Sequence, residues 1–173
     1  MATVTVSFTP LPAHVRTARF IAASVARRAG VAETVLDEVR LAVSEACSLA
    51  VRLHRAHAPT APIELRLTED SERFRIEVAD AVTRERPADD LDAALDLSDD
   101  DTSGVGQIAA DLGPDDAASG PDLRARERIG LAVIMGLVDE VEVEYLDGGS
   151  VVTMCWPISQ EATAGAKPGI GMF

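Results

Sequence analysis

Two hydrophobic periods alternate along this chain, and their order limits its fold more than any other feature. Between Thr3 and Phe8, apolar residues recur at every second position, which is the period of a half-buried strand. Residues Ala13 to Ala29 and Glu33 to His57 instead place their apolar side chains at helical spacing. Pro12 suits the first turn of the earlier helix, and Gly30 is placed to end it. The beginning of the chain therefore predicts a strand followed by two helices.

Two hairpins are predicted further along the chain. Their strands are the alternating runs around Ile63 to Leu67, Phe74 to Val78, Val141 to Tyr145 and Val151 to Trp156. Glu69-Asp70-Ser71 separates the first pair of strands and Asp147-Gly148-Gly149 the second, while a helix near Arg126 to Val138 precedes the second hairpin. This order of elements predicts an α+β two-layer sandwich, in which a mostly antiparallel mixed sheet carries its helices on one face.

Residues 84–122 differ sharply in composition from their flanks. They mix Asp, Ala, Gly, Ser and Pro and carry a run of aspartates between positions 89 and 101. Such a segment buries too little apolar surface to offset the entropy of ordering it, so a flexible acidic loop is predicted. Residues 159–173 show no period and predict a disordered C-terminal tail. A chain of 173 residues suits one domain, which is predicted to span residues 1–158 and to include the acidic loop.

Charge and composition exclude several classes of protein. The formal net charge of -13 repels nucleic-acid backbones and anionic membranes, whereas a basic protein partner is easily accommodated. No stretch approaches the roughly 20 apolar residues of a membrane span, so a cytoplasmic protein is expected. Cys47 and Cys155 lack metal-site spacing and are predicted to be reduced core residues. His14, His54 and His57 also lack metal spacing; His54 and His57 are expected to be exposed, and none receives a role.

Three segments carry recognisable patterns. Leu36 to Val51 contains Glu-Ala-Cys-Ser-Leu-Ala-Val, Phe74 to Asp80 is a strand ending in aspartate, and Glu127 to Val141 ends in Val-Asp-Glu-Val. Together they resemble the RsbW-like anti-sigma-factor serine kinases of the GHKL (Bergerat-fold, HATPase_c) ATPase superfamily. That family has Glu-Ala-Cys-Thr-Asn-Ala-Val, Asp-x-Gly-x-Gly and Gly-x-Gly-Leu-x-Leu-Ile at these places. The resemblance covers roughly Val4 to Trp156 and implies the Bergerat fold.

The resemblance implies roles for four residues in a nucleotide site. It matches Glu45 to a general base that activates water or a seryl hydroxyl, and Asp80 to the acceptor of the adenine amino hydrogen. Ser48 and Gly130 fall in the same site, Gly130 being the surviving glycine of its motif. From the residues alone, Glu45 is more simply a solvated helix glutamate. Asp80 is equally an aspartate that begins a surface turn, so both alternatives stay open.

The nucleotide motifs depart from the family at its metal ligand and at its glycines. Leu49 stands where the family has the asparagine that coordinates Mg²⁺, and leucine offers no oxygen. Val82 and Arg84 occupy expected glycine positions, where the backbone needs conformational freedom. Arg128 stands two residues before Gly130, at a further glycine position of the family. ATP and Mg²⁺ are thus implied by the resemblance but opposed by these residues, and no metal ligand is assigned.

Three functions are open at this point. The first is a homodimeric anti-sigma-factor-like regulator that binds a sigma factor, a STAS anti-anti-sigma partner or both, with impaired or absent use of ATP. For this function the resemblance aligns Arg19, close to Arg16, with an arginine that grips both partners, although a solvated helix face is the simpler alternative. The second is an active serine/threonine kinase of the STAS partner, with Glu45 as base. The third is a scaffold whose pocket is filled by side chains.

Overall fold

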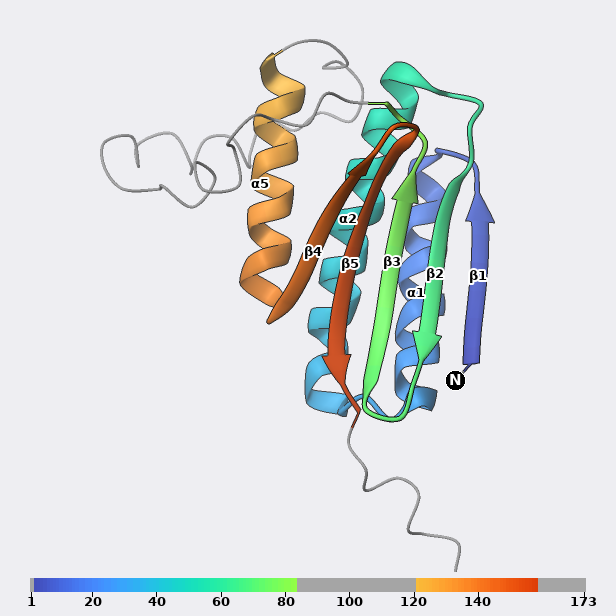
Figure 1. Cartoon of the computed structure of the whole chain (residues 1–173), viewed down its shortest axis with the longest axis vertical. Helices are drawn as coiled ribbons and strands as arrows, with labels where there is room; N and C mark the ends of the chain where they lie inside the picture. Colours follow the sequence, from blue (N-terminus) through green and yellow to red (C-terminus); the bar gives the residue numbers. More distant parts are fainter. Residues whose placement is uncertain (1, 84–120, 159–173) are drawn as a thin grey trace, which may run out of the picture.

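The computed structural model describes residues 2–83 and 121–158, which form an α+β unit (Figure 1). Its strands make one sheet in the order β1-β2-β3-β5-β4, and each pairing within it is antiparallel. The strands are β1 (Ala2–Phe8), β2 (Ile63–Glu69), β3 (Arg73–Asp80), β4 (Glu140–Leu146) and β5 (Gly149–Pro157). The helices are α1 (Pro12–Ala29), the 3₁₀ turn η1 (Glu33–Val35), α2 (Leu36–His57) and α5 (Pro121–Leu137).

The helices lie on one face of the sheet, as the sequence predicts. α1 and α2 pack against each other behind the strands, and α5 lies beside α2 near β4 (Figure 1). The core between these layers is built from small helix residues such as Ala22 and Ala42 and from larger strand residues such as Phe74 and Ile76. The alanines let the two helices approach closely, which suits a chain with 3% aromatic residues. Within the described ranges, no helix is long and apolar enough to cross a membrane.

Local sequence signals account for the helix boundaries. Pro12 occupies the first turn of α1, where its missing N–H is not needed. Gly30 follows with a left-handed φ of 95°, and the N–H of Val31 donates to the carbonyl of Ala26 across 3.0 Å. The apolar repeat of the second helix is buried from Leu36 onward, whereas Val35 lies in η1 and is half-buried. The predicted strand, helix, helix order is therefore confirmed.

Both predicted hairpin turns are present. Oδ1 of Asp70 accepts the N–H groups of Glu72 at 2.8 Å and Arg73 at 2.7 Å, and these bonds hold the pKa of the Asp70 carboxyl below its usual value. Leu146 pairs with Gly149, which leaves Asp147-Gly148 as a two-residue loop between β4 and β5.

Four sequence predictions require correction or remain outside the described residues. α5 begins at Pro121 rather than near Arg126, because Pro121 suits a first helical turn and the residues after it favour helix. The predicted acidic loop at 84–122 therefore loses its last two residues to α5, and 84–120 lie outside the described chain, as does the predicted tail at 159–173. Cys47 is buried in the core, as predicted, but Cys155 is only half-buried, because it alternates with buried neighbours on β5 and faces away from the helices.

Candidate functional site

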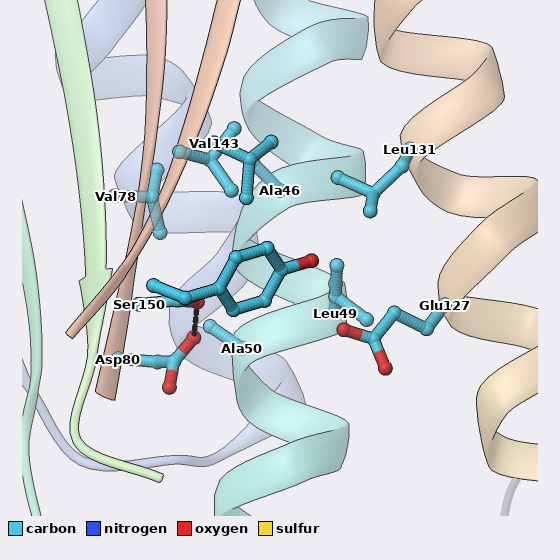
Figure 2. A pocket seen from close by; sticks show the side chains of 11 residues that line it. Ala46, Leu49, Ala50, Val78, Asp80, Glu127, Leu131, Val143 and Ser150 are labelled. Atoms are coloured by element: carbon cyan, nitrogen blue, oxygen red, sulfur yellow. Dashed lines mark hydrogen bonds between the residues drawn. The ribbon is translucent and has the colours of Figure 1, made fainter. Parts of the chain in front are cut away.

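A small pocket lies where β3 and β5 meet α2 and α5 (Figure 2). Asp80 and Ser150 line it from the sheet, and Leu49, Glu127 and Leu131 line it from the two helices. Its volume is about 10 Å³, which is about what a single water molecule needs. Sites for drug-sized ligands measure roughly 300–1,000 Å³. The pocket that the described residues form is therefore far smaller than a typical site for a ligand of that size.

Asp80 is held by hydrogen bonds on both carboxylate oxygens. The hydroxyl of Ser150 donates to Oδ2 across 2.6 Å, drawn as a dashed line in Figure 2, and the N–H of Val82 donates to Oδ1 across 3.0 Å. Ser150 is the Cα partner of Asp80 across the β3–β5 ladder and is 1% exposed. The structure therefore brings Asp80 to the pocket with a defined orientation, and Ser150 is a residue of this corner that sequence reasoning missed.

Gly149 allows β5 to approach the backbone of Asp80. Its φ is +154°, and a Cβ at this position would lie 1.9 Å from the carbonyl oxygen of Asp80 and 3.1 Å from Cα of Ala81. No side chain fits there without moving the end of β3. The sequence identified Gly149 as part of a turn, but not this close approach.

His54 lies next to this corner, and its burial contradicts the sequence prediction that it is exposed. The side chain is 0% exposed, Nε2 lies 3.0 Å from the N–H of Ala81, and Nδ1 lies 3.0 Å from the carbonyl oxygen of Ala61. The prediction was wrong because the position near a helix end suggested solvent, whereas the segments before β2 and after β3 cover it. Two polar partners satisfy the ring, as burial requires.

The helix side of the pocket combines two leucines, Leu49 and Leu131, with the carboxylate of Glu127. Leu49 is 4% exposed and forms a cluster with Leu53 and Val82, against which Leu131 of α5 packs. Leu49, which the resemblance aligns with the family's magnesium ligand, contributes no oxygen, and the other members of this hydrophobic cluster are also aliphatic. Across the described residues, no group of three or more His, Cys, Asp and Glu side chains is placed to hold a metal ion. Leu49 itself therefore cannot ligate a magnesium ion.

Glu45 and Ser48 are half-buried on α2 but do not line the pocket. Glu45 instead acts electrostatically on Arg52: burial lowers the pKa of Arg52, while Glu45 opposes that shift and Arg126 adds to it. Gly130 lies inside α5, where an added Cβ would meet Nη2 of Arg52 at an ordinary 3.8 Å. The structure thus places Asp80 at the pocket, whereas Glu45, Ser48 and Gly130 lie on the adjoining faces of α2 and α5.

The two candidate partner-binding arginines share an exposed aromatic ring. The guanidinium carbons of Arg16 and Arg19 lie 5.8 Å and 5.7 Å from the centroid of Phe20, whose side chain is 52% exposed. Such cation–π contacts hold both arginines against the helix surface. Sequence reasoning identified the arginines but missed Phe20, because a single aromatic residue at the edge of an apolar stripe gives no local signal of exposure.

Comparisons with known proteins agree with this architecture. The structure is similar to the crystal structure of the RsbU and RsbW domains of Rv1364c from Mycobacterium tuberculosis, with a TM-score of 0.56 and 15% identity over 90% of this chain. This chain covers 32% of that longer one, so the likeness concerns the fold. Comparison with curated protein sequences finds no match. Residues 8–156, nearly the whole described fold, match the histidine kinase-like ATPase domain, and the chain belongs to that family.

Proposed function

We propose that the protein is an anti-sigma-factor-like regulator that works by partner binding and not by efficient phosphate transfer. In this proposal it is cytoplasmic and homodimeric, and it binds a sigma factor, a STAS anti-anti-sigma protein or both. Membership of the histidine kinase-like ATPase family and the RsbW-containing structural neighbour support this class of function. The observation that carries the proposal is the buried aliphatic cluster around Leu49, where magnesium chemistry would need oxygen.

The Arg16–Phe20 surface supports a protein partner. Two arginines and an exposed aromatic ring are residue types that often dominate the energetics of protein interfaces. Their positive charge stands out on a protein with a formal net charge of -13, and the planar guanidinium groups suit carboxylates on a partner. This surface belongs to α1, and no residue of α1 lines the pocket. Partner binding therefore does not require the pocket to bind a nucleotide.

An active serine/threonine kinase is the second candidate function. Asp80 supports it, because a carboxylate at a pocket edge suits an acceptor of a nucleobase amino group. Glu45 would be its general base. The pocket volume of about 10 Å³ and the aliphatic side chain of Leu49 weigh against it.

Calorimetric titration with Mg·ATP, paired with radiolabel transfer to a STAS protein from the same host, separates the two functions. The regulator is expected to bind the STAS protein or a sigma factor without measurable phosphate transfer. Saturable micromolar Mg·ATP binding with transfer that is lost in Glu45→Gln would instead establish the kinase.

Partner binding has its own matched control. Arg19→Ala is expected to weaken capture of the sigma factor or STAS protein at least tenfold, since an interfacial arginine can contribute about 1.4 kcal/mol or more. Arg28→Ala removes an exposed arginine from the last turn of the same helix and should leave capture unchanged. Equal affinities for both variants, or no binding of either class of partner by the wild type, would contradict the proposal.

A further inference from the structure

His54 joins three segments that are distant in the sequence. It belongs to the last turn of α2, its Nδ1 meets the carbonyl of Ala61 before β2, and its Nε2 meets the N–H of Ala81 just after β3. The ring is fully buried. A buried imidazole with two backbone partners resists displacement, because moving it would leave a donor and an acceptor unsatisfied.

The two bonds determine which ring nitrogen carries the proton. A backbone N–H only donates, so Nε2 must be the unprotonated acceptor for Ala81. A carbonyl oxygen only accepts, so Nδ1 must carry the proton that is donated to Ala61. His54 is therefore the neutral tautomer protonated at Nδ1. A residue that merely filled space would need neither nitrogen.

Ala81 is the point where β3 leaves the sheet. The β3–β5 ladder ends at the Asp80–Ser150 pair, so Ala81 has no Cα partner there. His54 supplies an acceptor for its N–H at this point, and the next N–H, that of Val82, turns back to Oδ1 of Asp80. Fixing Ala81 thus fixes the short turn that orients the carboxylate of Asp80.

We propose that His54 is the positioning residue of the Asp80 corner, holding Ala81 so that Asp80 faces Ser150 in one orientation whether or not a ligand is present. This goes beyond the proposed regulatory function, because it assigns the shape of the pocket to a residue outside its lining. The residues that follow Asp80 are Ala81, Val82 and Thr83, so this turn lacks the conformational freedom of glycine. A side chain, that of His54, holds the turn in position.

Two amide substitutions, each of which keeps one of the two hydrogen bonds of His54, separate positioning from simple packing. The Oε1 of Gln reaches about as far as Nε2, so His54→Gln keeps an acceptor for Ala81 and loses the bond to Ala61. The amide of Asn reaches about as far as Nδ1, so His54→Asn keeps the donor to Ala61 and loses the bond to Ala81. Both variants remove one hydrogen bond and the aromatic ring, so comparable losses of global stability are expected, measured by denaturation with Trp156 as the fluorescent probe.

Amide hydrogen exchange of Val82 is the readout, because its N–H reports the orientation of Asp80. Protection of Ala81 and Val82, compared at equal global stability, is expected to stay within about threefold of wild type in His54→Gln. In His54→Asn it should fall about tenfold or more, since a lost hydrogen bond of about 1.4 kcal/mol corresponds to a factor of ten. His57→Gln alters an exposed histidine one turn away and should change neither amide.

Equal protection of Val82 in the Gln and Asn variants would overturn the proposal and leave His54 as a packing residue. ADP, added as a probe to the wild-type protein, is expected to leave both protections unchanged. A tenfold increase would show that ligand, and not His54, orients Asp80, and would also overturn it. Because no protein partner is present in any of these exchange measurements, the result does not depend on whether a sigma factor or STAS protein binds.

Discussion

The two sides of the pocket are built on opposite principles. At the sheet side, Asp80 is held by directional bonds from Ser150 and from the backbone. At the helix side, Leu49 packs in an aliphatic cluster that makes no directional demands. A polar corner tolerates almost no loss of geometry, because each unsatisfied group costs about 1–3 kcal/mol. An aliphatic cluster responds mainly to lost volume, so the Asp80 corner and the Leu49 cluster should respond differently to substitution.

The largest loss of stability is expected where the backbone of Gly149 approaches the backbone of Asp80. Gly149→Ala is expected to destabilise the protein by about 3 kcal/mol or more, because its Cβ would overlap the carbonyl of Asp80 and the backbone must adopt a strained φ. Urea denaturation followed by Trp156 fluorescence measures this. Gly148→Ala is the matched control, since nothing lies within 4 Å of its added Cβ. Similar losses in both variants would refute the close approach at Asp80.

In the Leu49 cluster, the loss of stability should depend on how much side-chain volume a substitution removes. Leu49→Ala is expected to cost about 2–3 kcal/mol, the range for a buried leucine whose cavity partly collapses. Leu41→Ala on the same helix removes a side chain that is 46% exposed and should cost much less, about 0.5 kcal/mol. Differential scanning calorimetry compares the two. If Leu49→Ala were as mild as Leu41→Ala, the cluster would not be a packed part of the fold.

Removing the hydrogen bond between Ser150 and Asp80 should have an intermediate effect on stability. Ser150→Ala leaves Oδ2 of Asp80 without its donor at 2.6 Å and is expected to cost about 1–2 kcal/mol. Thr153→Ala, at a half-buried position on the same strand, serves as the control and should stay within about 0.5 kcal/mol of wild type. Chemical denaturation of both variants provides the measurement. A neutral Ser150→Ala would mean that the Ser150 hydroxyl does not contribute to the stability of this corner.

The exclusion of water from Cys47 on α2 can be tested by the pH dependence of the free energy of unfolding. Burial raises the pKa of Cys47 to about 12 from the ordinary 9.0. The unfolded thiol then ionises first, so the folded state loses stability as pH rises above about 9, by about 1 kcal/mol between pH 9 and 10. Below pH 9 the contribution is fully present. Cys47→Ala should show a correspondingly shallower fall in stability over this interval, and parallel curves for the two proteins would place Cys47 in contact with water.

The smallest expected effect is on phosphate transfer. Leu49→Asn restores an oxygen at one position but leaves Val82 and Arg128 at expected glycine positions, so turnover with Mg·ATP should not rise above that of the wild type. Radiolabel transfer to a STAS protein measures it, with folding checked by circular dichroism. A clear gain in turnover would show that the leucine alone separates this pocket from a working one.

Much of the fold and part of the site follow from local sequence. The helical repeats, the stop at Gly30, the Asp147-Gly148 loop and the aliphatic character of Leu49 are properties of short stretches, readable from spacing and side-chain chemistry alone. The sequence also singled out Asp80, though it left open whether this aspartate lines a pocket or begins a surface turn.

Only the tertiary structure decided how Asp80 is held. Its partner Ser150 lies 70 positions away, and the bond from Ala81 to His54 spans 27. Burial of His54 and the close approach of Gly149 likewise depend on segments brought together by the sheet. No local period encodes such pairings, because hydrogen bonds between distant residues are set by strand order and register, whereas periodicity reports only which face of each element is apolar.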